Sequence, residues 1–211
     1  NPAEGEWLSP TQPFSVGFPT FAPHDLTEAS MWGRTLVDQL WCRIDFKKRR
    51  YDGLFTPNSL QGTIQNPGNC GVIDWGRVSS DPDRQLMLVN STGMPFEQLL
   101  YTREEADRMG IHMFNTEPSN AEQRGHGKGA SYPLEGTPYG VSSNAFLSPL
   151  GFHCHEPPLG RLTAIDLYTN IILWQRPIGT TEDQAHLGLA FPTGVFNIGG
   201  TATTRGRLVF M

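Results

Sequence analysis

The sequence predicts a mainly β protein made of short antiparallel strands, with one inserted helix and long loops. Hydrophobic residues make up 37% of the 211 positions, whereas 23 glycines and 17 prolines supply frequent turns. This balance favours many short strands over a helical bundle. The apolar run 86–90 lies between turn sequences of the Asp-Pro-Asp and Ser-Thr-Gly kind, and residues 162–175 form two apolar arms around a polar turn.

The charge balance excludes several classes of partner. A net charge of −5 and a pI near 5.6 give no general attraction to nucleic acid or to anionic lipid. The basic run 47–50 is expected at a helix end, where cations are favoured. The chain has no apolar run of the roughly 18 residues that a membrane span needs. It begins at Asn1 and stops on the strand-like residues LVFM, so we expect a fragment.

The first part of the chain combines an extended segment with a helical insertion at 25–50. Residues 1–24 are rich in proline and are expected to be extended. Asp25 or Thr27 caps a short helical turn, and Thr35 begins a longer helix that ends near Arg50. Five apolar side chains fall at helical spacing and are expected to pack against the core: Leu36, Val37, Leu40, Trp41 and Ile44.

The middle of the chain is expected to hold short strands and one long loop insertion. Segments 76–88 and 200–211 share an outline of glycine, polar strand, turn and apolar strand, which indicates weak internal repetition. Residues 102–134 are charged, rich in Gly, Asn, Gln and Ser, and show no strand alternation. We expect a short helix at their start and an exposed loop after it.

The cysteines and histidines give weak signals. Cys42, Cys70 and Cys154 are an odd number without CxxC spacing, so zinc is disfavoured and one pair could form a disulfide that the sequence does not identify. In the run His153-Cys154-His155-Glu156, the two histidines share a face and lack a third ligand. No metal ligands are therefore assigned. The remaining histidines in polar surroundings are expected to be solvated: His112, His126 and His186.

The hairpin segment 164–174, AIDLYTNIILW, has a specific frame, with Ala164 first, Asp166 third and Trp174 eleventh. This frame resembles the tryptophan-docking repeat (AxDxxTGKxxW) of the eight-bladed quinoprotein dehydrogenases, in which each Trp holds one propeller blade to the next. Asn170 and Ile171 stand where that pattern has Gly and Lys. Asparagine tolerates the left-handed conformation that the glycine supplies, so the turn is preserved.

Further motifs extend the resemblance along nearly the whole chain. The strongest are LSPTQPFS, LTEASMWG, RYDGLFTPNSLQGT, PGNCGVIDWGRVSSDP, GTPYGVSSNAFLSPLGFHC, LTAIDLYTNIILWQRPIGT and GGTATTRGRLVF. Together they resemble the membrane-bound, pyrroloquinoline-quinone-dependent (PQQ-dependent) glucose, quinate and shikimate dehydrogenases. The resemblance implies that residues 1–211 are a single fragment of a partial eight-bladed β-propeller, about three blades of four-stranded antiparallel sheets. One difference is Leu159, which replaces a Trp common in the family.

The resemblance also assigns candidate site residues. It places the catalytic base Asp, the metal ligands and the cofactor-capping His upstream, so none is carried onto this chain. Asp74, where relatives often have Glu, and Asn90 are expected to face the cofactor. The alternatives are purely structural roles, in which Asp74 caps a turn beside Trp75 and Asn90 forms an Asx turn. The structural docking residues are expected to be Trp174, Ala164 and Asp166.

Two functional hypotheses follow. The first is a piece of a dehydrogenase on the periplasmic side of the bacterial inner membrane, with PQQ and Ca²⁺ or Mg²⁺ as cofactors. It would oxidise a sugar, polyol or cyclic hydroxy acid and pass electrons to ubiquinone, while the fragment alone would be inactive and could self-associate through its blade edges. The alternative is a non-catalytic propeller-repeat scaffold or binding module.

Overall fold

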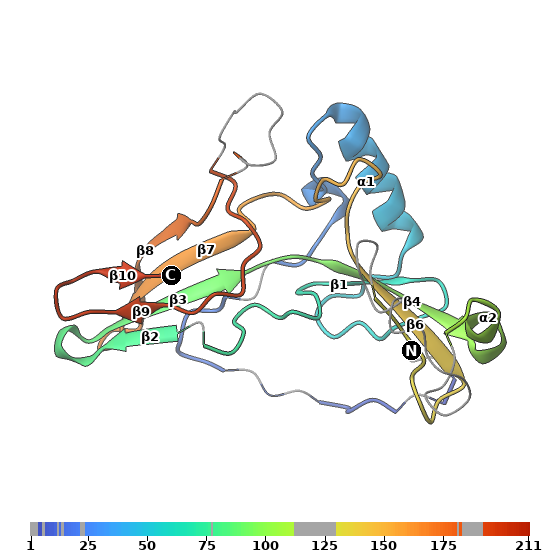
Figure 1. The fold of residues 1–211 in the computed structure, drawn as a ribbon, viewed down its shortest axis with the longest axis horizontal. Helices are drawn as coiled ribbons and strands as arrows, with labels where there is room; N and C mark the ends of the chain where they lie inside the picture. The colour runs from blue at the N-terminus through green and yellow to red at the C-terminus, as the bar shows by residue number, and fades with distance from the viewer. Residues whose placement is uncertain are drawn as a thin grey trace. The chain divides into compact units, whose positions relative to one another are not determined.

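The computed structural model describes residues 4–5, 7–11, 13, 15–21, 24–76, 78–111, 130–180, 182 and 192–211 (Figure 1). His112, His126 and His186 lie outside the described residues. The chain divides into two compact units, which we describe separately. Unit 1 comprises Asn1–Gln12, Asp25–Asn69 and Pro95–His155, and unit 2 comprises Pro13–His24, Cys70–Met94 and Glu156–Met211.

Unit 1 is built on a four-stranded antiparallel sheet with the order β1-β4-β6-β5. Its strands are β1 (Thr63–Gln65), β4 (Phe96–Thr102), β5 (Ala130–Tyr132) and β6 (Tyr139–Ala145). The central pair β4 and β6 is joined over seven residues each, from Phe96↔Ala145 to Thr102↔Tyr139. The prediction of a mainly β chain with antiparallel four-stranded sheets is confirmed for this unit.

The helical part of unit 1 begins where the sequence predicts. Thr27 caps the 3₁₀ helix η1 (Glu28–Ser30), and Thr35 caps α1 (Leu36–Lys48) by accepting the N–H of Asp38 at 3.1 Å. Thr35 provides the hydroxyl acceptor that the first turn of a helix needs. Lys47 and Lys48 occupy the last turn of α1, as expected for cations at the negative end of the helix dipole.

The prediction that the apolar stripe of α1 packs against the core is wrong for four of its five side chains. Within unit 1 the buried side of the helix carries Asp38, Cys42 and Asp45 instead. Cys42 is bonded covalently to Cys154, and the Asp38 carboxylate accepts the N–H of Arg34 at 3.1 Å. These attachments fix the rotation of the helix. Trp41 is half-buried against the core, whereas the rest of the stripe is exposed: Leu36, Val37, Leu40 and Ile44.

The core of unit 1 gathers around the disulfide. Cys42 and Cys154 are 112 residues apart in sequence, and their Cα atoms lie 5.3 Å apart. Cys70 is not part of this bond. The disulfide completes a buried cluster that also contains Leu26, Met31, Ile64 and Phe146.

The predicted insertion 102–134 starts with the short helix α2 (Arg103–Arg108), which is capped by Thr102. Its last part departs from the prediction, because residues 130–132 form β5 rather than a loop and pair with β6. Neighbouring strands decide this pairing, and the local pattern carries no sign of it. The part of the insertion between residues 112 and 129 lies outside the described residues.

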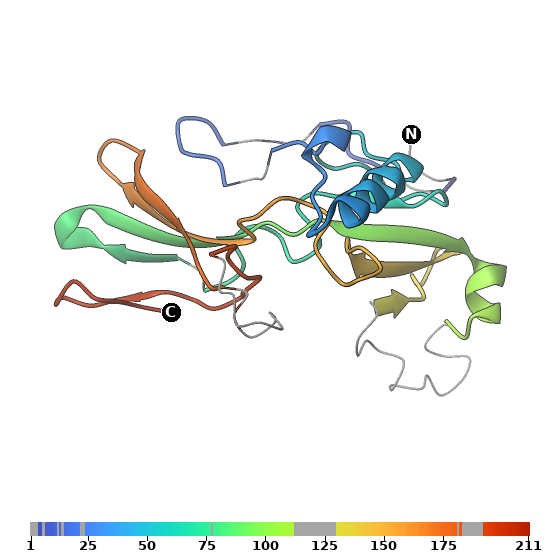
Figure 2. The ribbon, with the colours of Figure 1, turned by 90° about the horizontal axis from the view of Figure 1, so that it is seen from above.

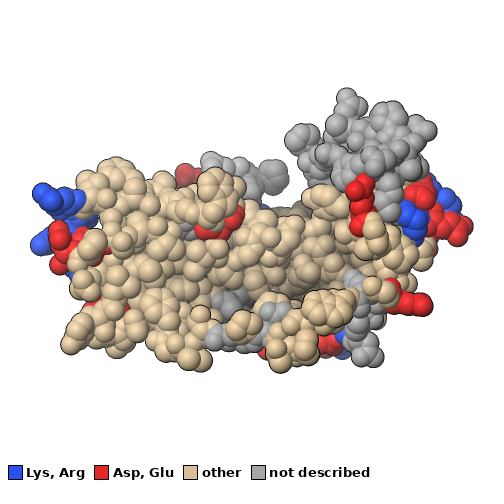
Figure 3. All heavy atoms as spheres, turned by 90° about the horizontal axis from the view of Figure 1, so that it is seen from below, with Lys and Arg blue, Asp and Glu red and all other residues tan. Residues whose placement is uncertain are grey.

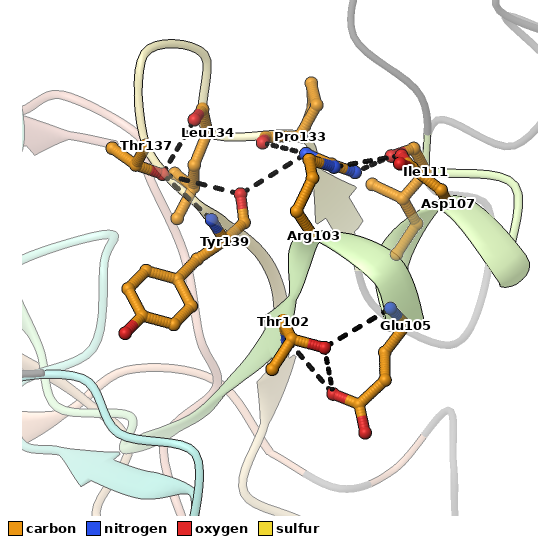
Figure 4. A network of polar contacts seen from close by, with 9 residues as sticks. All are labelled: Thr102, Arg103, Glu105, Asp107, Ile111, Pro133, Leu134, Thr137 and Tyr139. Carbon is orange, nitrogen blue, oxygen red and sulfur yellow. Dashed lines mark hydrogen bonds and ion pairs between the residues drawn. The ribbon is translucent and has the colours of Figure 1, made fainter. Parts of the chain in front are cut away.

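Arg103 joins the two described stems of this insertion (Figure 4). Its guanidinium donates to the carbonyl oxygen of Ile111 on one side and to that of Pro133, at 2.7 Å, on the other. It also donates to the carboxylate of Asp107 at 2.9 Å and to the carbonyl oxygen of Tyr139 at 3.3 Å. One planar side chain with five donors thereby satisfies three backbone carbonyls that lie far apart in sequence.

Unit 2 holds a second four-stranded antiparallel sheet, with the order β2-β3-β7-β8 (Figures 1 and 2). Its strands are β2 (Val78–Asp81), β3 (Leu86–Thr92), β7 (Gly160–Asp166) and β8 (Ile171–Pro177). The 3₁₀ helix η2 (Pro82–Arg84) joins β2 to β3. A hairpin of β9 (Ala202–Thr203) and β10 (Val209–Phe210) lies beside β2, where the Ser79 and Thr201 hydroxyls are 2.8 Å apart. Both segments predicted to repeat therefore form hairpins.

The β7–β8 hairpin is the predicted strand–turn–strand element. The Asp166 carboxylate accepts the N–H groups of Tyr168 at 2.8 Å and Thr169 at 3.0 Å, and these bonds lower its pKa. Asn170 adopts a left-handed φ of 59°, as predicted. Ala164 is buried opposite Trp174, whose ring is 5.7 Å from the Arg176 guanidinium carbon.

On the face drawn in Figure 3, most of the coloured atoms belong to uncharged residues. Acidic and basic residues occur together in a few small groups, and no extended basic area is visible among the coloured atoms of this face. Among the described residues, no helix has the length and apolar character required to cross a bilayer.

Candidate functional site

Asn90 is the most deeply placed of the predicted site residues. It lies on β3 opposite Leu162 of β7 and is completely buried. Its side-chain nitrogen donates to Oδ1 of Asn197 and, at 2.7 Å, to the carbonyl oxygen of Gly199. Asn90 is thus part of a strand, so the alternative interpretation as an Asx turn is wrong.

The side-chain oxygen of Asn90 has no donor among the described residues, although it is buried. Leaving a buried acceptor unsatisfied costs roughly 1–3 kcal/mol. A hydroxyl or N–H group of a bound molecule would relieve that cost. The two bonds made by the nitrogen fix the orientation of the amide, so the oxygen is held in place for such a donor.

The segment 193–200 holds Asn90 through several backbone contacts within unit 2. The Thr92 hydroxyl donates to the carbonyl oxygen of Asn197 at 3.0 Å, and the Leu159 N–H donates to that of Thr193 at 2.9 Å. Leu159 is buried in this arrangement. The chain approaches so closely that a Cβ on Gly200 would lie 2.3 Å from the carbonyl oxygen of Gly76. The segment is therefore both hydrogen-bonded to β3 and closely packed within unit 2.

Asp74 lies in a neighbouring segment of the same unit. The Thr92 N–H donates to the carbonyl oxygen of Val72 at 2.9 Å, which places residues near 72 beside the end of β3. Asp74 is half-buried, and its carboxylate accepts the N–H of Trp75 at 2.9 Å. That bond matches the alternative in which Asp74 caps a turn. The neighbouring Trp75 side chain is 89% exposed.

Sequence reasoning missed Asn197 and Gly199, which position Asn90. They lie 107 and 109 residues further along the chain. No spacing or local pattern in FNIGG marks them as partners of β3. Ala164, Asp166 and Trp174, the predicted docking residues, come together in the β7–β8 hairpin. None of them is the strand partner of Asn90, which is Leu162.

A cavity in unit 1 is not a better candidate. It has a volume of about 450 Å³, and its lining includes Trp7, Phe55, Asn58, Gln65 and Tyr139. The Gln65 amide donates to the carbonyl of Asn58 at 3.0 Å, so these two polar groups already satisfy one another. The cavity contains none of the residues predicted to face a cofactor.

The histidine run 153–155 forms part of the unit 1 fold. Cys154 is consumed by the disulfide, and His155 makes a β-bridge with Met31. Among the described residues, no three His, Cys, Asp or Glu side chains cluster in a way that could hold a metal. Burial lowers the pKa of His153 below its ordinary value of 6.5.

The lowered pKa of His153 predicts a loss of stability in mild acid. Below pH 6.5 the unfolded chain binds a proton that the folded state resists until its lower pKa is reached. The free energy of unfolding should therefore fall across that window, by at most about 1.4 kcal/mol per pH unit. Denaturation at a series of pH values should show a shallower decline for His153→Gln. The same change at the exposed His24 is the control, and equal slopes in His153→Gln and wild type would contradict the assignment.

Comparison with known proteins gives a consistent result. The family model "PQQ: Glucose/ethanol/alcohol dehydrogenase, beta-propeller domain" matches residues 1–211. The chain is 40% identical over 214 residues to "Quinoprotein glucose dehydrogenase" of Escherichia coli (strain K12), covering 99% of this chain and 26% of the relative. It is 40% identical over 217 residues to "Probable quinate dehydrogenase (quinone)" of Xanthomonas campestris pv. juglandis, covering 98% and 26%.

A third relative widens the range of named substrates. The chain is 38% identical over 214 residues to "Glycerol dehydrogenase large subunit" of Gluconobacter oxydans (strain 621H), covering 98% of this chain and 28% of the relative. The chain spans about a quarter of the length of these curated relatives. The two antiparallel four-stranded sheets are consistent with the family match, which covers residues 1–211. The chain therefore belongs to the PQQ-dependent glucose/ethanol/alcohol dehydrogenase family, and residues 1–211 match the β-propeller domain of that family.

Proposed function

We propose that this chain is a portion of a PQQ-dependent dehydrogenase that oxidises a hydroxyl group of a sugar, polyol or cyclic hydroxy acid. The names of the relatives support that substrate range, since they include glucose, quinate and glycerol. In this proposal the whole protein works on the periplasmic side of the inner membrane and delivers electrons to ubiquinone. Bound PQQ, with Ca²⁺ or Mg²⁺, supplies the two-electron acceptor.

The observation that carries the proposal for this chain is the buried acceptor oxygen of Asn90. We assign to it a hydrogen bond from an N–H or hydroxyl donor of the cofactor or the substrate. Asn197 and Gly199 orient the amide by accepting both of its N–H groups. Asp74, on the adjoining segment, is the second residue proposed to face the cofactor, where its carboxylate can accept a hydroxyl proton in a hydrogen bond.

Residues outside this chain complete the proposed site. Abstraction of the hydroxyl proton and ligation of the metal are assigned to those residues. A site formed inside a closed propeller needs all of its blades. The 211-residue chain alone, supplied with PQQ and calcium, is therefore expected to show no turnover.

The test uses the full-length dehydrogenase and the change Asn90→Ala. Loss of one hydrogen bond to a bound group should weaken PQQ affinity, or raise KM for the substrate, by about tenfold, which corresponds to roughly 1.4 kcal/mol. PQQ titration of the apoenzyme and steady-state kinetics with an artificial electron acceptor measure the two effects separately.

Asn197→Ala is the companion variant, because it removes one of the bonds that orient the Asn90 amide and keeps the acceptor oxygen of Asn90, so it should weaken binding less than Asn90→Ala does. If Asn90 served only the fold, both variants would lose stability alike and keep wild-type PQQ affinity and KM. That result would overturn the assignment of Asn90. Absence of PQQ-dependent activity in the wild-type full-length protein would overturn the proposed function itself.

A further inference from the structure

We propose that the native disulfide of this chain forms by way of a non-native one, and that the chain is therefore a substrate of a thiol–disulfide isomerase with a Cys-X-X-Cys site. The native bond joins Cys42 to Cys154. It passes over Cys70, which lies between them in the sequence and stays outside the bond. The order of the three cysteines and their places in the two units carry this inference, which concerns how the fold is reached and not the oxidation of a hydroxyl group.

Cys70 is a closer partner for Cys42 in the unfolded chain than Cys154 is. Cys70 follows Cys42 by 28 positions (from 42 to 70), whereas 112 positions separate the native pair. The entropy cost of closing a flexible loop grows with the logarithm of the loop length, so this fourfold difference favours contact with Cys70 by roughly eightfold. Before the chain folds, loop length therefore favours the non-native bond between Cys42 and Cys70.

The direction of synthesis strengthens this preference. Cys154 follows Cys70 by 84 positions (from 70 to 154). A chain that is made at about 5–20 residues per second needs roughly 4–17 s to add them. A disulfide can form within seconds where an oxidant is present, and a protein with a structural disulfide matures in an oxidising compartment. Cys42 and Cys70 therefore have time to react with each other before Cys154 is available.

The native fold has no place for the bond between Cys42 and Cys70. Cys42 lies on α1 and is completely buried in the unit 1 core, where its sulfur is bonded to that of Cys154. Cys70 is half-buried and belongs to unit 2. Since a sulfur atom takes part in one disulfide only, a chain that holds the non-native bond lacks the link at the centre of the unit 1 core. That bond has to be exchanged before unit 1 can be completed.

The exchange proceeds without net oxidation of the chain. A dithiol oxidase first accepts two electrons from Cys42 and Cys70, and its own disulfide becomes two thiols. A thiolate of the isomerase then attacks the Cys42 sulfur, forms a mixed disulfide and releases the Cys70 thiolate. The Cys154 thiolate attacks the same sulfur, forms the native bond and releases the thiolate of the isomerase. Each step breaks one sulfur–sulfur bond and forms one, and each released thiolate takes up the proton that an attacking thiol has lost.

Burial explains why this exchange depends on an enzyme. Both native sulfur positions are completely buried, so folding of unit 1 closes the site to thiols in solution. Uncatalysed rearrangement of disulfides takes minutes to hours. During that time the apolar side chains of the core cluster, which include Ile64 and Phe146, lack the link that completes the cluster. An isomerase that acts on the partly folded chain shortens this interval.

The experiment produces the full-length protein in bacteria that either contain or lack the disulfide isomerase of the secretory compartment. Thiols are blocked with N-ethylmaleimide at harvest, and mass spectrometry of unreduced peptides from whole cells measures both bonds. Without the isomerase, the ratio of the Cys42–Cys70 bond to the Cys42–Cys154 bond should rise severalfold. An isomerase that lacks the second cysteine of its Cys-X-X-Cys site should be captured on Cys42 or Cys70 as a mixed disulfide. Equal ratios in the two hosts would overturn the proposal.

The variant Cys70→Ala decides whether Cys70 is the competing partner. In this variant the native bond should form to the same extent in both hosts, because the non-native partner is gone. A dependence on the isomerase that persists in Cys70→Ala would overturn the proposal, as would a bond from Cys42 to a cysteine elsewhere in the full-length protein. Both measurements read the connectivity of the disulfides, so they are separate from the PQQ-dependent activity that tests the proposed function.

Discussion

Replacing Cys42 and Cys154 together by alanine is expected to lower the free energy of unfolding by about 2–5 kcal/mol. The bond links residues 112 positions apart, so it removes many conformations from the unfolded chain. Both side chains are also completely buried in the unit 1 core, where the shorter alanines would leave unfilled space. The disulfide therefore contributes through the unfolded state and through packing.

Guanidinium denaturation of the full-length protein, followed by circular dichroism, measures this loss. Cys70→Ala is the matched control, because Cys70 stays outside the disulfide and belongs to unit 2. Adding a reductant should shift the wild-type midpoint toward that of the double variant and leave the double variant unchanged. A double variant as stable as Cys70→Ala would show that this bond does not stabilise the protein.

Gly194→Ala is expected to destabilise unit 2 by about 2–5 kcal/mol. Gly194 has a φ of +63°, which costs a residue with a side chain roughly 1–2 kcal/mol. A Cβ there would also lie 2.4 Å from the carbonyl oxygen of Gly160 and 2.8 Å from its nitrogen. Relieving that overlap requires a backbone shift between segment 193–200 and β7, which adds about 1–3 kcal/mol.

Gly71→Ala separates the two contributions. Gly71 lies in the same unit with a φ of +67°, and a Cβ there would meet nothing within 4 Å. It should cost only the conformational part, about 1–2 kcal/mol. Thermal unfolding of the full-length protein compares the two variants, and equal losses would contradict the close approach of segment 193–200 to β7. Because this segment orients Asn90, Gly194→Ala should also weaken PQQ binding, whereas Gly71→Ala should reduce stability alone.

The elements that the sequence predicts correctly are those governed by neighbouring residues. Thr35 begins α1 because its hydroxyl meets the N–H of Asp38, three residues later. The hairpin 160–177 forms because Asp166 and Asn170 supply the turn between two apolar arms. The ordered motifs along the chain also predict the family, which the match over residues 1–211 confirms.

The tertiary structure alone decided the pairings between distant residues. It selected Cys154 as the partner of Cys42 and gave Asn90 its contacts with Asn197 and Gly199. It also turned the apolar stripe of α1 outward, because covalent and polar attachments on the other side outweigh the preference of four side chains for burial. A local sequence pattern reflects interactions between residues that are close in the chain. The disulfide and the contacts of Asn90 join residues more than 100 positions apart, and the orientation of α1 depends on which of its sides is attached to the core. For that reason the sequence determined the family and the local elements, and the tertiary structure decided how the candidate site is held.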